Sequence, residues 1–139
     1  MPRIEFFYRM FLGIDPMKKK ILLIDDQEDL IELTRRILQS HGYEVVGLTD
    51  GEGALEIIKG ESPHLVILDM IMPGKDGTEI CQEMKSDATT RHIPVILSTG
   101  QMLEPGDFSR EGLKEADGYL MKPFEIDELL SKIQSLLPL

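Results

Sequence analysis

The sequence predicts an α/β fold, in which a doubly wound, five-stranded parallel sheet is covered by five helices on both faces. Short apolar runs of strand length alternate with segments whose apolar residues recur at helical spacing. The apolar runs are nearly continuous, which indicates that both faces of the sheet are covered. The chain has 139 residues, enough for one domain with a substantial buried core.

Five runs are expected to be strands, and each is bounded by residues that favour turns. Gly42, the segment 60–63 and Gly118 separate the runs from the helical stretches. Right-handed crossover connections between parallel strands then give three layers. The runs are ILLI (21–24), YEVVGL (43–48), HLVILD (64–69), PVILS (94–98) and GYLM (118–121).

The stretches between these runs carry apolar stripes that predict helices. GEGALE (51–56) should begin the second helix, with Thr49 or Asp50 as its N-cap and Glu52 completing a capping box for Thr49. The segment 102–114 is the weakest candidate, because it contains a proline and two glycines. The stripes are Leu30, Leu33 and Ile37; Ala54, Leu55 and Ile58; Ile80, Cys81 and Met84; and Ile126, Leu129, Leu130, Ile133 and Leu137.

Residues 1–16 differ from the rest of the chain. They hold four of the eight aromatic residues, and residues 1–20 carry a net charge of +3 against −13 for the remainder. Charged residues interrupt the apolar stretch, which argues against a signal peptide. We expect residues 1–16 to be a poorly packed extension or an artefact of start-site choice, and 17–139 to be the domain. An amphipathic docking segment is the alternative.

The composition excludes several classes of protein. Acidic residues outnumber basic ones 25 to 15, which argues against a nucleic-acid binder and against docking on anionic lipid. Cys81 is the single cysteine, so no internal disulfide and no cysteine-based zinc site can form. No apolar run approaches the ~20 residues that span a bilayer, so no membrane insertion is expected. We therefore expect a cytoplasmic protein.

Polar side chains follow four of the five predicted strands. Asp25 and Asp26 close the first, Asp69 the third, Thr99 the fourth and Lys122 the fifth. In an open parallel sheet, ligands bind beyond the carboxyl ends of the strands. Neighbouring first and third strands would crowd three carboxylates, which favours a compensating cation, and hard oxygen ligands select ions such as Mg²⁺. The site suits phosphoryl transfer, with a carboxylate as acceptor.

The motifs ILLIDD, HLVILDMIMPGKDG, IPVILSTG and ADGYLMKPF resemble the receiver domain of two-component response regulators from about Lys18 onward. The resemblance implies a flavodoxin-like strand order 2-1-3-4-5. It also implies a phosphoacceptor, a magnesium site and a conformational switch. These roles would fall on Asp69 as phosphoacceptor; Asp25, Asp26, Asp69 and the Ile71 carbonyl as Mg²⁺ ligands; Thr99 and Lys122 as phosphoryl-oxygen contacts; and Tyr119, moving with Thr99, as the aromatic switch.

The resemblance also implies partners. A sensor histidine kinase or a phosphotransfer domain would donate the phosphoryl group, and a downstream protein would bind the modified form, which would also form a homodimer. The domain would support its own phosphorylation and dephosphorylation without being an enzyme in the usual sense. No output domain follows Leu139 in this sequence, so we expect a stand-alone receiver.

Two other functions remain open at this stage. A phosphatase of the haloacid-dehalogenase kind would want a second aspartate two residues after Asp69, where this chain has Ile71. An unphosphorylated receiver could act only as an interaction module, although the acidic pair, Asp69, Thr99 and Lys122 are all in place. The segment after Thr99 departs from the family pattern through Pro105 and its glycines, so we expect a shortened or reshaped helix there.

Overall fold

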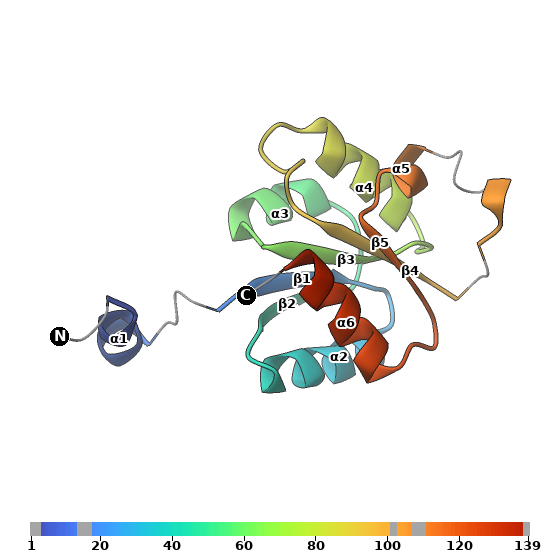
Figure 1. Ribbon diagram of the computed structural model, residues 1–139. Helices are drawn as coiled ribbons and strands as arrows, with labels where there is room; N and C mark the ends of the chain where they lie inside the picture. The colour runs from blue at the N-terminus through green and yellow to red at the C-terminus, as the bar shows by residue number, and fades with distance from the viewer. Residues whose placement is uncertain (1–3, 14–17, 101–102, 107–110, 138–139) are drawn as a thin grey trace.

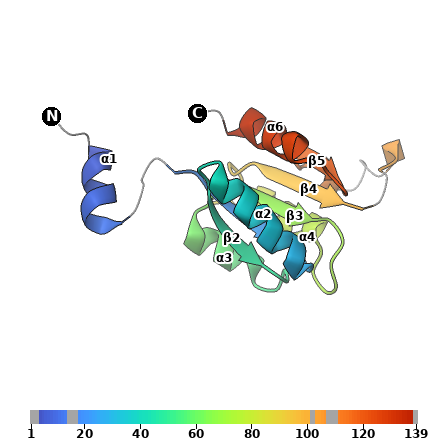
Figure 2. The same cartoon turned by 90° about the horizontal axis from the view of Figure 1, so that it is seen from below.

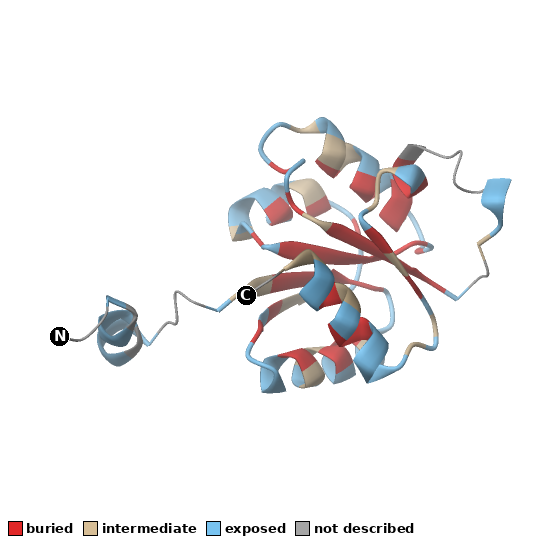
Figure 3. Cartoon of the chain, viewed as in Figure 1, coloured by how far each residue is buried: buried red, intermediate tan, exposed pale blue. Residues whose placement is uncertain are grey.

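The computed structural model describes residues 4–13, 18–100, 103–106 and 111–137. One parallel sheet with the strand order β2-β1-β3-β4-β5 forms its centre, which confirms the expected fold class and order. The near-continuous apolar runs are buried along most of their length, in particular in the three central strands (Figure 3). The strands are β1 (Lys20–Ile24), β2 (Glu44–Leu48), β3 (Leu65–Asp69), β4 (Val95–Thr99) and β5 (Gly118–Met121).

Helices cover both faces of the sheet (Figures 1 and 2). On one face, α2 (Glu28–Ser40) and α6 (Ile126–Leu136) bury their apolar stripes against β1, β3 and β4. On the other face, α3 (Ala54–Glu61), α4 (Gly77–Ser86) and α5 (Glu111–Lys114) enclose a second apolar cluster. Each face of the sheet therefore has its own core, as the two-sided apolar strands require.

The starts of two helices show how local chemistry sets their boundaries. Helix α4 is capped by Asp76, whose side chain accepts a hydrogen bond from the amide of Glu79 at 3.1 Å. The predicted capping box of α3 is wrong, because Gly53 precedes the helix with a positive φ of 68°. The Asp50 carboxylate instead accepts the amide of Glu52 at 2.7 Å, so it stabilises the turn before the helix.

The segment between β4 and β5 contains only one turn of α-helix in its described part. A short 3₁₀ turn lies at Pro105–Gly106 and is followed by the four residues of α5. This agrees with the expectation of a shortened helix, while positions 102 and 107–110 of the predicted segment lie outside the described residues.

A separate helical stretch, α1 (Ile4–Phe7) and the π-helical η1 (Tyr8–Leu12), precedes the sheet (Figure 1). Its large apolar side chains are exposed, and Phe11 is the most exposed of them at 70%. Phe7 and Phe11 stack on each other with ring centroids 5.8 Å apart. Among the described residues, no helix combines the length and the apolar character that crossing a membrane requires.

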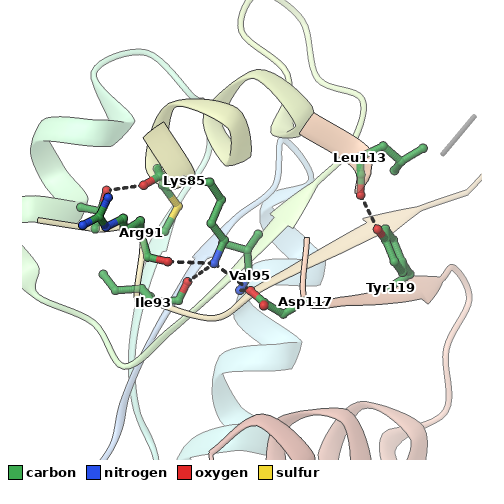
Figure 4. Close-up of polar contacts among 9 residues, drawn as sticks. Lys85, Arg91, Ile93, Val95, Leu113, Asp117 and Tyr119 are labelled. Atoms are coloured by element: carbon green, nitrogen blue, oxygen red, sulfur yellow. Dashed lines mark hydrogen bonds and ion pairs between the residues drawn. The ribbon is translucent and has the colours of Figure 1, made fainter. Parts of the chain in front are cut away.

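At the amino-terminal edge of the sheet, Lys85 joins three elements (Figure 4). Its ammonium donates to the carbonyls of Arg91 and Ile93, at 3.2 and 2.9 Å, and to the carboxylate of Asp117 at 2.9 Å. The same Asp117 oxygen accepts the amide of Val95 at 2.8 Å. This amino-edge network ties the end of α4 to the first residues of β4 and to the chain entering β5.

Candidate functional site

The register of the parallel strands brings the predicted site residues to one edge. Strand β1 lies beside β3, and β3 beside β4, with Asp69 opposite Ser98 in the register. Strand β4 is followed by β5, so that Thr99 closes β4 one strand away from Asp69 and Lys122 follows β5. We call this carboxyl edge, with Asp25, Asp26, Asp69, Thr99 and Lys122, the acidic rim.

Three carboxylates gather on the acidic rim. Asp25, Asp26 and Asp69 each offer an oxygen, and these oxygens lie within 4.8 Å of one another. Asp25 and Asp69 are buried, with 4% and 6% of their surface exposed, whereas Asp26 is exposed. Hard oxygen donors at this spacing, with one side open to solvent, fit a Mg²⁺ ion that keeps part of its water shell.

Lys122 is the cation of the acidic rim. Its ammonium lies 2.6 Å from Asp25 Oδ2 and 3.4 Å from Asp69 Oδ2, and its peptide bond to Pro123 is cis. The other oxygens of the two aspartates accept backbone amides: Asp25 Oδ1 that of Gln27 at 2.9 Å, and Asp69 Oδ1 that of Ile71 at 3.3 Å. Lys122 thus contacts two of the three carboxylates, and its single positive charge leaves the rim negative.

Asp69 has the most perturbed ionisation on the acidic rim. Its burial, assisted by the negative charge of Asp25, raises its pKa to about 6, while Lys122 and the amide of Ile71 oppose the rise. A divalent cation beside the carboxylate favours the ionised form. A cation bound at this site would therefore favour the ionised form of Asp69.

Thr99 and Tyr119 lie on the same side of the neighbouring strands β4 and β5, and both line a cavity of about 350 Å³. Thr99 is buried, and its carbonyl accepts the amide of Lys122 at 2.7 Å. The Tyr119 hydroxyl donates to the Leu113 carbonyl of α5 (Figure 4). Burial raises the pKa of this phenol, so the hydroxyl keeps its proton at neutral pH.

The structure brings the side chains predicted for the site to one edge of the sheet. Tyr119 lies in β5, the strand that pairs with β4. Ile71 follows two residues after Asp69 with a half-exposed side chain, and its amide contacts the Asp69 carboxylate. Its carbonyl as a Mg²⁺ ligand stays a prediction, as do the individual roles of the other residues.

Sequence reasoning missed one residue of the site. Gly77, the first residue of α4, packs directly on the backbone of Asp69. A β-carbon at Gly77 would stand 2.9 Å from the carbonyl carbon of Asp69 and closer still to its oxygen. The pair Asp76-Gly77 in the sequence was the available signal, because glycine is common where two backbones approach closely.

Comparison with known proteins gives consistent results. A family model described as the response regulator receiver domain matches residues 21–134. A probable transcriptional regulator, ycf27 of Cyanophora paradoxa, is 42% identical over 123 residues, which cover 86% of this chain and 48% of that protein. The chain therefore spans about half the length of this curated relative.

Solved structures agree with this match. The chemotaxis protein CheY4 of Vibrio cholerae is 29% identical, with a TM-score of 0.78 over 86% of this chain and 99% of that one. The response regulator protein TrrA of Thermotoga maritima, solved in complex with Mg²⁺-BeF, is 35% identical, with a TM-score of 0.75 and coverage of 86% and 99%. Fold, site and comparisons together place this chain in the family of response regulator receiver domains.

Proposed function

We propose that this chain is a phosphorylation-controlled switch in which Asp69 accepts a phosphoryl group. The donor is the phosphohistidine of a sensor histidine kinase or of a phosphotransfer domain, and the reaction requires Mg²⁺. The observation that carries the proposal is the acidic rim, where Asp69 lies within reach of Asp25, Asp26 and Lys122.

The chemistry follows from this arrangement. An oxygen of the ionised Asp69 attacks the phosphorus, a P–O bond forms, and the P–N bond to the donor imidazole breaks as the imidazole takes up a proton. Asp25, Asp26 and Asp69 would hold Mg²⁺, which neutralises charge on the phosphoryl oxygens when it is bound. The ammonium of Lys122, now beside Asp25 and Asp69, would pair with one of these oxygens.

The modified state differs from the unmodified one by its charge. The phosphoryl group on the acidic rim carries about −1.5 to −2 charges, which replace the single negative charge of the ionised Asp69 carboxylate and are spread over more oxygens. The Thr99 hydroxyl gains a charge-assisted hydrogen-bond partner there, which is about twice as strong as a neutral one. Movement of Thr99 changes the shape of the cavity that it shares with Tyr119, and with it the surface offered to a partner. The same surface is the one we propose for a phosphorylation-dependent homodimer.

Intact-mass measurement tests the proposal. The protein is incubated with Mg²⁺ and a small acyl phosphate, and we expect a gain of one phosphoryl group that is lost in Asp69→Asn and when Mg²⁺ is removed by chelation. Asp87→Asn, at the amino edge of the sheet, is the matched control and should still be modified. No adduct on the wild type would instead favour a pure interaction module, and rapid turnover of general phosphoesters would favour a hydrolase.

A further inference from the structure

The hydroxyl of Tyr119 is held by α5. It donates a hydrogen bond to the carbonyl of Leu113 (Figure 4), while the Leu113 side chain is fully buried in the core on that face of the sheet. The position of this carbonyl therefore helps to decide where the ring of Tyr119 lies. The contacts that hold α5 in place therefore also hold the Leu113 carbonyl, the hydrogen-bond acceptor of the proposed switch residue Tyr119.

Helix α5 has only one turn, so its own backbone hydrogen bonds give it little stability and packing must hold it in place. Gly112 provides the closest packing. A β-carbon at Gly112 would stand 2.7 Å from the carbonyl carbon of Thr78 and 3.1 Å from its Cα, and nearer still to the carbonyl oxygen. Since such distances are not tolerated, α5 can lie against α4 in this way only with glycine at position 112.

Gly112 packs against the first turn of α4. The same turn packs on the backbone of Asp69, the proposed phosphoacceptor. Gly77, the neighbour of Thr78, packs on the carbonyl of Asp69, and its amide donates to the carbonyl of Met70 at 3.2 Å. Asp76 fixes the same turn, because its carboxylate accepts the Thr78 hydroxyl at 2.6 Å. Backbone contacts thus run from Asp69 through the start of α4 to α5, and the Tyr119 side-chain hydroxyl joins α5 through the Leu113 carbonyl.

We propose that Gly112 is a positioning residue of the switch: it seats α5 on Thr78, and this contact links the state of Asp69 to Tyr119 independently of Thr99. A change in the backbone after Asp69 shifts the first turn of α4, the shift changes the fit of Gly112, and the Leu113 carbonyl moves relative to the Tyr119 hydroxyl. The inference rests on the proposed function and adds a second connection between the acidic rim and Tyr119.

The test compares two glycines of the segment between β4 and β5. Gly112→Ala introduces the clash with Thr78, whereas a β-carbon at Gly106 meets nothing within 4 Å, so Gly106→Ala is the matched control. The protein is labelled with fluorotyrosine, the Tyr119 resonance is assigned with Tyr119→Phe, and ¹⁹F spectra are recorded with and without Mg²⁺ and beryllofluoride.

We expect the Tyr119 resonance to move on addition of Mg²⁺ and beryllofluoride in the wild type and in Gly106→Ala. In Gly112→Ala the Tyr119 resonance should already differ from that of the wild type before Mg²⁺ and beryllofluoride are added. Their addition should then change the ratio of the two Tyr119 states by at least about twofold less than in the wild type. Gly112→Ala should change the beryllofluoride affinity by no more than about threefold, because Gly112 does not touch the acidic rim and acts on it only through the switch. A merely structural role would leave the response of the folded variant unchanged.

A double-variant cycle gives a second readout. If Gly112 acts through the Tyr119 hydroxyl, Gly112→Ala should change beryllofluoride affinity in the wild type but not in a Tyr119→Phe background. Equal effects in both backgrounds would overturn the inference.

The remaining outcomes are also decisive. A Gly112→Ala variant that responds like the wild type overturns the inference and leaves the proposed function intact, whereas a wild type that binds no beryllofluoride overturns both. If Gly112→Ala does not fold, hydrogen exchange of the wild type replaces it. The amides of α5 should then change protection when Mg²⁺ and beryllofluoride are added, and unchanged protection contradicts the inference.

Discussion

A lysine contacts aspartate at each end of the sheet, and the two environments differ. At the amino edge, Lys85 bonds one carboxylate, Asp117, and two backbone carbonyls, and the aspartate oxygen it contacts also accepts a backbone amide. At the acidic rim, Lys122 faces Asp25 and Asp69, with Asp26 beside them. The first group is balanced in charge, and the second has an excess of negative charge.

This difference in charge balance distinguishes a structural ion pair at the amino edge from a candidate ligand-binding site at the acidic rim. At the amino edge, the charges of Lys85 and Asp117 offset each other, and the network holds α4, β4 and β5 together. At the acidic rim, the pKa of Asp69 is raised to about 6 because burial and Asp25 outweigh Lys122. The rim would therefore gain stability from a bound cation or from a proton, which the charge-balanced amino-edge network would not.

The largest expected effect comes from removing each lysine in turn. Lys85→Met removes three hydrogen bonds, to Asp117 and to two carbonyls, and at about 1 kcal/mol each this should lower the free energy of unfolding by about 3 kcal/mol. Lys122→Met should destabilise the protein less, because the rim carboxylates can take up a proton or a cation. Mg²⁺ at 10-fold excess over its dissociation constant should recover part of the lost stability, on the order of 1.4 kcal/mol.

Urea unfolding with and without Mg²⁺ measures both variants, and Lys114→Met, at an exposed lysine, is the control with an expected change below about 0.5 kcal/mol. A Lys85→Met variant that Mg²⁺ rescues as well as Lys122→Met would remove the distinction between the two ends of the sheet.

The second prediction concerns pH. Because the pKa of Asp69 is about 6 in the folded state and 3.8 ordinarily, the folded protein binds more protons between these values, and its stability falls as pH rises from about 4 to 6. Asp69→Asn removes this titration. The variant should be more stable than the wild type by about 2 kcal/mol at pH 7.5 without Mg²⁺, and the difference should shrink below pH 5.

Unfolding curves at both pH values give the measurement, with Asp87→Asn as the control at the amino edge. An Asp69→Asn variant that is less stable than the wild type at pH 7.5 would contradict the prediction, because it would mean that the fold stabilises the ionised Asp69 carboxylate.

The third prediction concerns the cation. Asp26→Asn removes an exposed carboxylate of the acidic rim and should weaken Mg²⁺ binding by at least about 10-fold, with little effect on unfolding in the absence of Mg²⁺. Calorimetric titration with Mg²⁺ measures the affinity. Unchanged Mg²⁺ affinity in Asp26→Asn would exclude this side chain as a ligand.

The smallest expected effect tests the amino-edge network again. Asp117→Asn keeps an oxygen that can accept from Val95 and Lys85 but removes the charge, so the cost should be about 1 kcal/mol and should not depend on Mg²⁺. Unfolding in urea checks the value. A loss as large as that of Lys85→Met would mean that the charge, and not the hydrogen bonds, holds the network together.

Much of the architecture could be predicted from local patterns. The apolar runs gave all five strands to within one residue at each end, and the polar residues that close them gave the acidic rim, because parallel strands bring their carboxyl ends to one edge. The start of α3 was predicted wrongly. Thr49 and Asp50 are both good caps in isolation, but the chain enters the helix through Gly53 with a positive φ, which a local capping pattern does not reveal.

The sequence by itself determined the alternation of strands and helices, the negative charge, and the side chains that meet at the acidic rim, since these depend on residue type and spacing. Tertiary structure alone decided the partners of each group. Lys85 and Asp117 are 32 positions apart, Lys122 and Asp25 are 97 apart, and Gly112 contacts the backbone of Thr78. Such contacts depend on how helices and strands pack, and packing distances of a few tenths of an ångström leave no periodic signature in the chain.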